Sequence, residues 1–112
     1  MTDLNKVTLL GTLSIDPISR KMPSGSAYAR FTLVTGYTWK DAKKIGRVED
    51  GHTIVAFGKL AEIAAQYLKK GDRVYVEGRL KTWKGRESGQ ARNVRNEVLL
   101  TNLIMLGKAS KP

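Results

Sequence analysis

The chain has 112 residues, no cysteine and a formal net charge of +10, because its 20 lysine and arginine residues outnumber its 10 aspartate and glutamate residues. A chain of this length forms one domain that buries roughly two thirds of its unfolded surface. The lack of cysteine excludes a disulfide framework, a thiolate metal site and a cysteine nucleophile. The basic excess indicates an anionic partner, and nucleic acid first, because bound phosphates release condensed cations. The alternative is a basic surface that only keeps the protein soluble.

Residues 1–6 lack the basic and apolar regions of a secretory signal, and the sequence has no apolar run long enough to span a membrane. We therefore expect a cytoplasmic, nucleoid-associated protein.

The first half of the chain has two segments typical of strands. Apolar residues alternate with polar ones through residues 4–15, and residues 28–39 are rich in β-branched and aromatic side chains. Between them, Pro23, Ser24 and Gly25 indicate a turn. The polar residues 40–51 predict a flexible loop.

Residues 54–80 have the pattern of a strand, a helix and a second strand. The helix is predicted from the spacing of its apolar face, which consists of Leu60, Ile63, Ala64, Tyr67 and Leu68. Gly71 is expected to end it in a left-handed conformation. A short strand over residues 53–57 precedes the helix. After the helix, the alternation of apolar and polar residues from Val74 predicts the next strand.

The last third of the chain begins with a basic segment at residues 81–95, in which Glu87 is the one acidic residue. We expect a basic hairpin arm there, then a fifth strand over residues 97–106. Residues 1–107 form the expected domain, and residues 108–112 a short basic tail.

Five short strands with one helix between the third and fourth predict an all-β OB-fold, a small Greek-key barrel that binds single strands or oligosaccharides. An SH3-like barrel is the alternative fold, but it leaves the helix unexplained.

Seven sequence blocks resemble bacterial single-stranded DNA-binding proteins, in the same order and at similar spacing. They cover almost the whole chain: Leu4-Asn5-Lys6-Val7-Thr8-Leu9-Leu10-Gly11-Thr12-Leu13 with Asp16-Pro17, Arg20-Lys21-Met22-Pro23-Ser24-Gly25, Phe31-Thr32-Leu33, Trp39-Lys40-Asp41, Phe57-Gly58-Lys59-Leu60-Ala61-Glu62, Tyr67-Leu68-Lys69-Lys70-Gly71 and Val74-Tyr75-Val76-Glu77-Gly78-Arg79-Leu80. The resemblance implies the OB barrel reached above.

The resemblance also implies roles for individual residues. Trp39 and Phe57 match two aromatic residues on which the family stacks bases. Two further aromatic positions of the family fall on Gly51 and Gly85 here, although Trp83 lies two residues before the second.

The resemblance further implies a homotetramer, and it places the single histidine, His52, near a subunit contact. Family members usually continue into an acidic tail that recruits repair and replication enzymes. This sequence ends at Lys111-Pro112 without such a tail, so it is expected to be either the binding domain of a longer protein or a variant without that recruiting function.

Binding of single strands without sequence preference needs flat rings for the bases and cations for the phosphates. The candidate rings are Trp39, Phe57 and Trp83. The candidate cations near them in sequence are Lys40, Lys43, Lys44, Lys59, Arg79, Lys81, Lys84, Arg86 and Arg92. The alternatives are that the rings belong to the core and that the cations form a solvated face.

No enzymatic site is expected. The glycines of residues 46–53 have a spacing similar to a phosphate-binding loop, but His52 stands in place of its lysine and a strand follows instead of a helix. His52 also lacks a second histidine or a cysteine to share a metal. We therefore expect no cofactor and a protein that binds single-stranded DNA. The alternatives are a primosome-type OB dimer that acts mainly through protein contacts, and an RNA-binding or chaperone OB module.

Overall fold

The computed structural model describes residues 2–84 and 94–108, except for the side chains of residues 84 and 94. Seven elements follow one another: β1 (Val7–Leu13), β2 (Ile18–Lys21), β3 (Ala27–Lys40), β4 (Ile45–Phe57), α1 (Lys59–Tyr67), β5 (Asp72–Lys84) and β6 (Val94–Lys108). Within these residues, no helix is long and apolar enough to cross a membrane.

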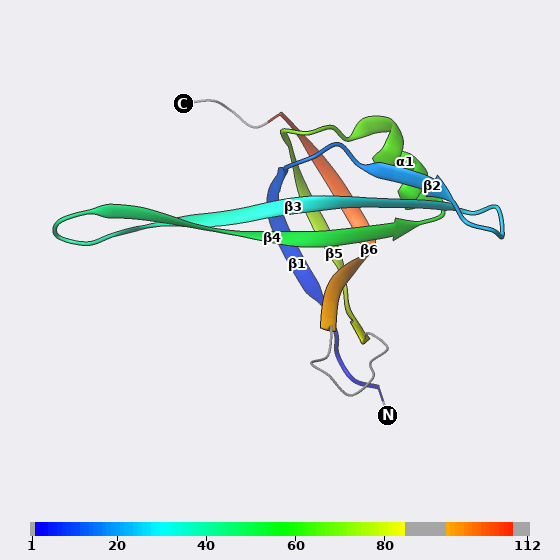
Figure 1. Cartoon of the computed structure of the whole chain (residues 1–112), viewed down its shortest axis with the longest axis horizontal. Helices are drawn as coiled ribbons and strands as arrows, with labels where there is room; N and C mark the ends of the chain where they lie inside the picture. Colours follow the sequence, from blue (N-terminus) through cyan, green and yellow to red (C-terminus); the bar gives the residue numbers. More distant parts are fainter. Residues whose placement is uncertain (1, 85–93, 109–112) are drawn as a thin grey trace.

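The strands form one curved sheet in the order β1-β5-β6-β4-β3-β2, and β1 also pairs with β3. This last pairing closes β1, β5, β6, β4 and β3 into a barrel, with β2 outside it on the edge of β3 (Figure 1). All pairings are antiparallel except that of β4 with β6. The predicted five-stranded OB barrel is confirmed. Along the chain, α1 comes between the third and fourth barrel strands, which are β4 and β5.

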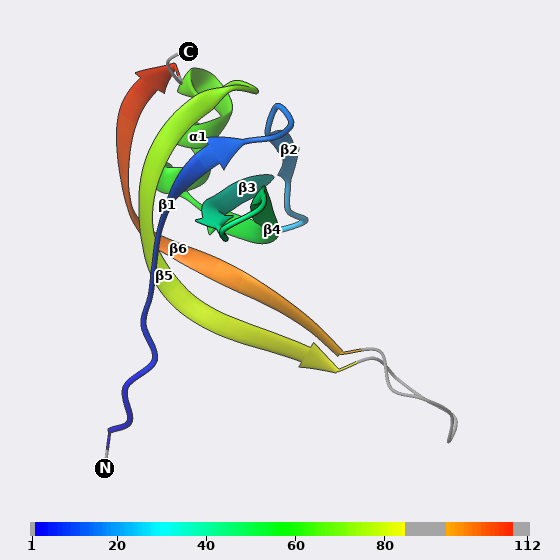
Figure 2. The same cartoon turned by 90° about the vertical axis from the view of Figure 1, so that its left-hand side faces the viewer.

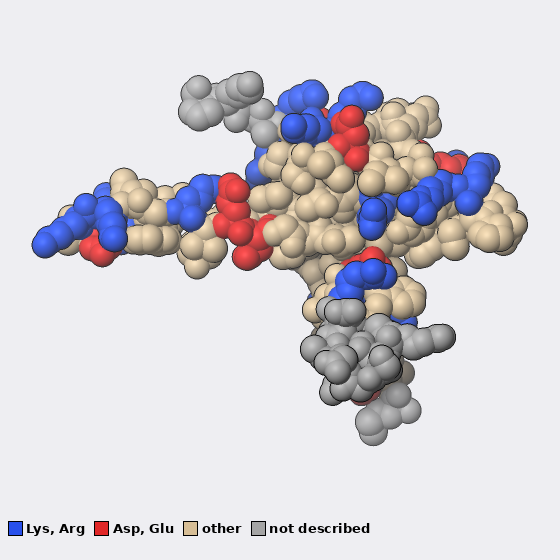
Figure 3. Space-filling model, viewed as in Figure 1, with Lys and Arg blue, Asp and Glu red and all other residues tan. Residues whose placement is uncertain are grey.

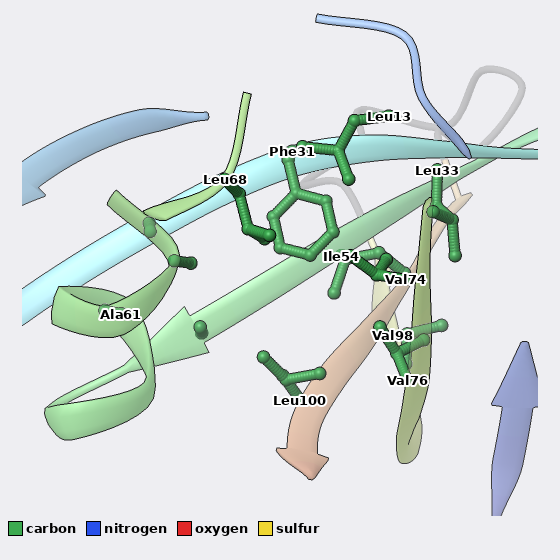
Figure 4. Packing of buried hydrophobic residues seen from close by; sticks show 13 residues of the cluster. Leu13, Phe31, Leu33, Ile54, Ala61, Leu68, Val74, Val76, Val98 and Leu100 are labelled. Carbon is green, nitrogen blue, oxygen red and sulfur yellow. The ribbon is translucent and has the colours of Figure 1, made fainter. Parts of the chain in front are cut away.

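The core lies between the barrel strands and α1 (Figure 4). Phe31 and Leu33 of β3, Ile54 of β4, and Val74 and Val76 of β5 are fully buried there. In β3 and β5 the buried residues alternate with half-buried ones, because successive side chains of a strand point to opposite faces. Replacing Phe31 with alanine would cost about 3–5 kcal/mol of stability.

Helix α1 covers one end of the barrel with Ala61 and Ala64, and Leu68, which follows it, is also buried. Tyr67 was predicted to lie on the apolar face of the helix, and this prediction was wrong, because its side chain is 55% exposed. Gly71 has the expected left-handed conformation with φ of 93°. The helix itself ends earlier, at Tyr67, because Leu68 already has an extended backbone.

Two hairpins project from the barrel, one formed by β3 and β4 and the other by β5 and β6 (Figures 1 and 2). They explain a radius of gyration of 16.4 Å, since a compact domain of this length has about 13 Å. The β5–β6 hairpin confirms the two legs of the predicted basic arm. Its residues 85–93 lie outside the described part of the chain.

Two predictions about the strands were wrong. The expected loop at residues 40–51 is mostly strand, since β4 begins at Ile45 and pairs with β3 as far as Lys40. Ladder hydrogen bonds do not require burial, so the polarity of this segment did not indicate a loop. Strand β2 was not predicted, because its four residues are all exposed and show no apolar alternation.

Candidate nucleic-acid interface

The β3–β4 ribbon carries two of the predicted rings near its opposite ends. Phe57 pairs with Tyr28 at one end, and Trp39 pairs with Gly46 at the other. The 11 residue steps from Tyr28 to Trp39 correspond to about 36 Å at the rise of a strand. The two rings therefore do not form one stack within a chain, and a nucleic acid that touches both must follow the ribbon.

Trp39 lies across its cross-strand partner Gly46. A Cβ atom added to Gly46 would come within 2.2 Å of Cζ2 of the indole, so only glycine leaves room for the ring in this position. Trp39 remains 39% exposed, which argues against the alternative that it is a core residue.

The predicted cations Lys40, Lys43 and Lys44 surround the same hairpin tip. The backbone N–H of Asp41 donates to the Lys44 carbonyl at 2.8 Å, which closes the turn and leaves all three lysines exposed. Figure 3 shows lysine and arginine side chains gathered at this tip, with acidic side chains between it and the barrel. The positive charge is therefore concentrated next to Trp39.

Phe57 ends β4 and is 46% exposed. Its ring centroid lies 5.4 Å from that of Tyr28, and the two ring planes are tilted by 59°. Tilted pairs of this kind are attractive, and the two rings are not stacked face to face. Lys59, the first residue of α1, is exposed two residues further along the chain. An exposed ring and an exposed cation are therefore close together in sequence at the end of β4.

Tyr28 was missed as a site residue, together with Arg20, Lys21 and Arg30. These four residues line an open pocket of about 370 Å³ with Met22 and Pro23. Strand β2 brings Arg20 directly opposite Tyr28 and Ile18 opposite Arg30. The available signal was the turn at residues 22–26, which folds two basic residues back towards Tyr28.

Trp83 lies on the β5–β6 hairpin and is 42% exposed. Its indole Nε1 donates a hydrogen bond to Glu97 Oε1 at 2.7 Å. The Lys81 ammonium lies 4.6 Å from the centroid of the same ring, a favourable cation–π geometry. The ring is therefore held by a carboxylate at its edge and by a cation over its face.

Glu97 is buried, although it pairs with Lys81 of the basic arm. It is 7% exposed, and its Oε2 lies 3.7 Å from Nε of Arg95. Arg79, a predicted phosphate contact, is exposed on the same strand as Lys81. The predicted residues Arg86 and Arg92 lie outside the described part of the chain, as does the side chain of Lys84.

His52 lies in β4 at the base of the β3–β4 hairpin and is half-buried. Its Nε2 and the Thr35 hydroxyl are hydrogen-bonded at 2.9 Å. The residues once compared with a phosphate-binding loop belong to β4 and open no helix. Within residues 2–84 and 94–108, no three histidine, aspartate or glutamate side chains are placed to hold a metal ion.

The outer face of β1, β5 and β6 carries a row of paired residues. Leu10 pairs with Tyr75, and Tyr75 pairs with Ile104; Leu10 and Ile104 are 48% and 49% exposed. Two residues further along β5, Glu77 accepts a hydrogen bond from the Tyr75 hydroxyl at 2.5 Å. This bond raises the pKa of Tyr75 and lowers the pKa of Glu77, which also accepts from Asn102.

Comparison with known families finds a match to the family described as "Single-strand binding protein family" over residues 4–106. A relative named "Single-stranded DNA-binding protein 1", from Chlorobaculum tepidum, is 44% identical over 107 residues. The alignment covers 93% of this chain and 65% of the relative, so the chain spans about two thirds of that protein's length.

Comparison with solved structures gives a match to a Plasmodium falciparum SSB complex with ssDNA. The TM-score is 0.83 with 31% sequence identity, and the match covers 95% of this chain and 97% of the other. The barrel with its single helix is therefore shared with a structure that contains a bound single strand.

Proposed function

Because the chain belongs to the single-strand binding protein family, we propose that it binds single-stranded DNA with little sequence preference. Its role is then to protect exposed strands during replication, recombination or repair. The family is one of DNA-binding proteins and not of enzymes, and we propose no catalytic activity.

The observation that carries this proposal is the pairing of exposed rings with cations at separate places on the molecule. Trp39 lies beside the lysines of the hairpin tip, Phe57 beside Lys59, and Trp83 under Lys81. Every base has a π face and every phosphodiester link carries a charge, so such pairs bind single strands without sequence preference. In duplex DNA the base faces are stacked on one another, so these rings favour single strands.

Competition among single-stranded DNA, duplex DNA and RNA of one length tests the proposal. We expect single-stranded DNA to bind most tightly, with an affinity that falls on a log–log plot against salt by about 0.7 per contacted phosphate. Preference for RNA or for duplex DNA would favour the RNA-binding or chaperone alternative. Weak binding of all three by a dimer would favour the primosome-type alternative.

We also propose that the protein assembles as a homotetramer. A closed tetramer with dihedral symmetry uses more than one kind of contact between copies. The row of Leu10, Tyr75 and Ile104 offers one apolar surface, on the outer face of the barrel. His52, on β4, offers a second and separate position, and we keep it as an interface residue.

We propose a cytoplasmic, nucleoid-associated location, because that is where a protective protein meets exposed strands. The assignment of residues 1–107 as the binding domain remains a prediction. Lys108, placed by that prediction in the tail, is the last residue of β6, and its Nζ lies 3.7 Å from Asp72 Oδ1.

A further inference from the structure

Three residues form a row across β2, β3 and β4. Arg20 pairs with Tyr28, and Tyr28 pairs with Phe57. Side chains directly opposite one another on neighbouring strands have Cβ atoms about 5 Å apart and share a face. The stacking position at Phe57 therefore continues into a second ring and then into a guanidinium group, all on one surface.

The surroundings of Tyr28 are cationic. The pocket of about 370 Å³ beside it is lined by Arg20, Lys21 and Arg30, with Met22 and Pro23. None of the three cations forms an ion pair with another described residue. Of the described residues that line this pocket, none is acidic; Glu62 lies in the neighbouring pocket on the helix side. The positive charge here is available to a ligand.

Two properties of Tyr28 suit a base. Its ring is tilted by 59° to that of Phe57, so the two rings are not stacked face to face. It also borders a pocket on each of two sides, the cationic one and the one shared with α1. A base stacked on Tyr28 would have its phosphate within the reach of arginine and lysine side chains, which bind phosphate oxygens well.

We propose that Tyr28, Arg20, Lys21 and Arg30 form a nucleotide-binding subsite, which takes the nucleotide next to the one stacked on Phe57. Tyr28 holds its base, and the three cations hold its phosphate. The inference rests on the proposed function. It gives the bound DNA strand a path beyond Phe57, across β3 towards β2.

Replacing Tyr28 with leucine tests the stacking part. With an oligothymidine, Tyr28→Leu should weaken binding about 5- to 150-fold, the range given by loss of one base–aromatic stack, with the salt dependence unchanged. Tyr67→Leu is the matched control, because Tyr67 is an exposed tyrosine on α1 that lines neither pocket. Arg20→Gln should instead lower the salt slope by about 0.7, the value for one phosphate.

Photocrosslinking of the unaltered protein gives a second test that does not depend on how a variant folds. An oligonucleotide with 5-iododeoxyuridine, irradiated in the complex and digested, should leave an adduct on Tyr28 that mass spectrometry locates. Adducts at Phe57 and Trp39 but not at Tyr28, together with unchanged affinity of Tyr28→Leu, would overturn the subsite and leave the proposed function standing. A protein that binds no single strand at all would overturn both.

Discussion

The indole of Trp39 occupies the space in which Gly46 would carry a side chain, and the two residues are direct partners on β3 and β4. Gly46→Ala should therefore displace the ring, since the added Cβ would come within 2.2 Å of it. The side chain is half exposed and can move, so we expect reduced affinity for single-stranded DNA with little change in thermal stability. A DNA titration and a melting curve on one sample measure both.

Gly51→Ala is the control for this experiment. A Cβ at Gly51 would meet only the Thr32 methyl group, at 3.6 Å, which is an ordinary contact. Equal affinities for the two alanine variants would show that the position of the Trp39 ring does not matter for binding.

Alanine at Trp39 or Phe57 separates binding from packing. Both rings are at least 39% exposed, so each variant should keep its fold and lose about 1–3 kcal/mol of binding free energy per stacked base. Core residues would instead lose about 3–5 kcal/mol of stability. Melting temperatures that fall steeply while affinity is kept would identify the rings as packing residues.

The sequence predicted the barrel well because buried residues alternate along β3 and β5, as at Phe31 and Leu33 or at Val74 and Val76. The prediction failed for strand segments that bury few or no side chains. Strand β2 and the outer half of β4 are stabilised by pairing with β3, and pairing across a ribbon leaves little apolar periodicity to detect.

The same failure limited the candidate site. Trp39 and Phe57 were proposed because they match aromatic positions of the resembling family, and Trp83 because it lies two residues from another such position, among lysines. Tyr28 and Arg20 became neighbours only through the register of β2 against β3. Similarly, Glu97 could not be recognised as the partner of Trp83, because 14 residues separate them along the chain.

Ile104→Lys should separate the proposed tetramer into smaller units. Ile104 is 49% exposed in the single chain, so a lysine there leaves the barrel intact but places like charges at a contact between copies. Ile45→Lys is the matched control, because it makes the same chemical change at a residue that is 67% exposed on the projecting hairpin. Light scattering on both variants and the parent reports the mass, and a monomeric parent at micromolar concentration would contradict the tetramer.

The Tyr75–Glu77 pair should be visible in a pH titration. The Tyr75 hydroxyl donates to Glu77, so losing its proton breaks the bond and the pKa of Tyr75 is raised. Its contribution to stability is present below the pKa of an unfolded tyrosine and is lost as the pH rises through the folded value. The lowered pKa of Glu77 acts in the opposite sense, so that its contribution is lost as the pH falls through the folded value.

Ultraviolet absorbance of the phenolate follows this titration. Of the 4 tyrosines, the one with the raised pKa should disappear from the curve in Tyr75→Phe. Glu77→Gln should lower the pKa of Tyr75 back towards its ordinary range, because the charged acceptor is gone. An identical curve for Glu77→Gln and the parent would show that the bond does not control the titration.

Trp83→Phe should destabilise the protein although it keeps a ring at an exposed position. The change removes the N–H that donates to Glu97 at 2.7 Å, and it leaves a carboxylate that is 7% exposed, with an ion pair to Arg95 at 3.7 Å. Leaving a buried acceptor unsatisfied costs about 1–3 kcal/mol.

Trp39→Phe is the matched control, because the Trp39 indole lies across a glycine and no described residue accepts its N–H. Urea unfolding should give a lower free energy of unfolding for Trp83→Phe than for Trp39→Phe, and Glu97→Gln, which keeps an oxygen acceptor, should lie between the parent and Trp83→Phe. If Trp83→Phe and Trp39→Phe unfold alike, the bond to Glu97 does not stabilise the arm, and Trp83 is held by Lys81 and strand pairing alone.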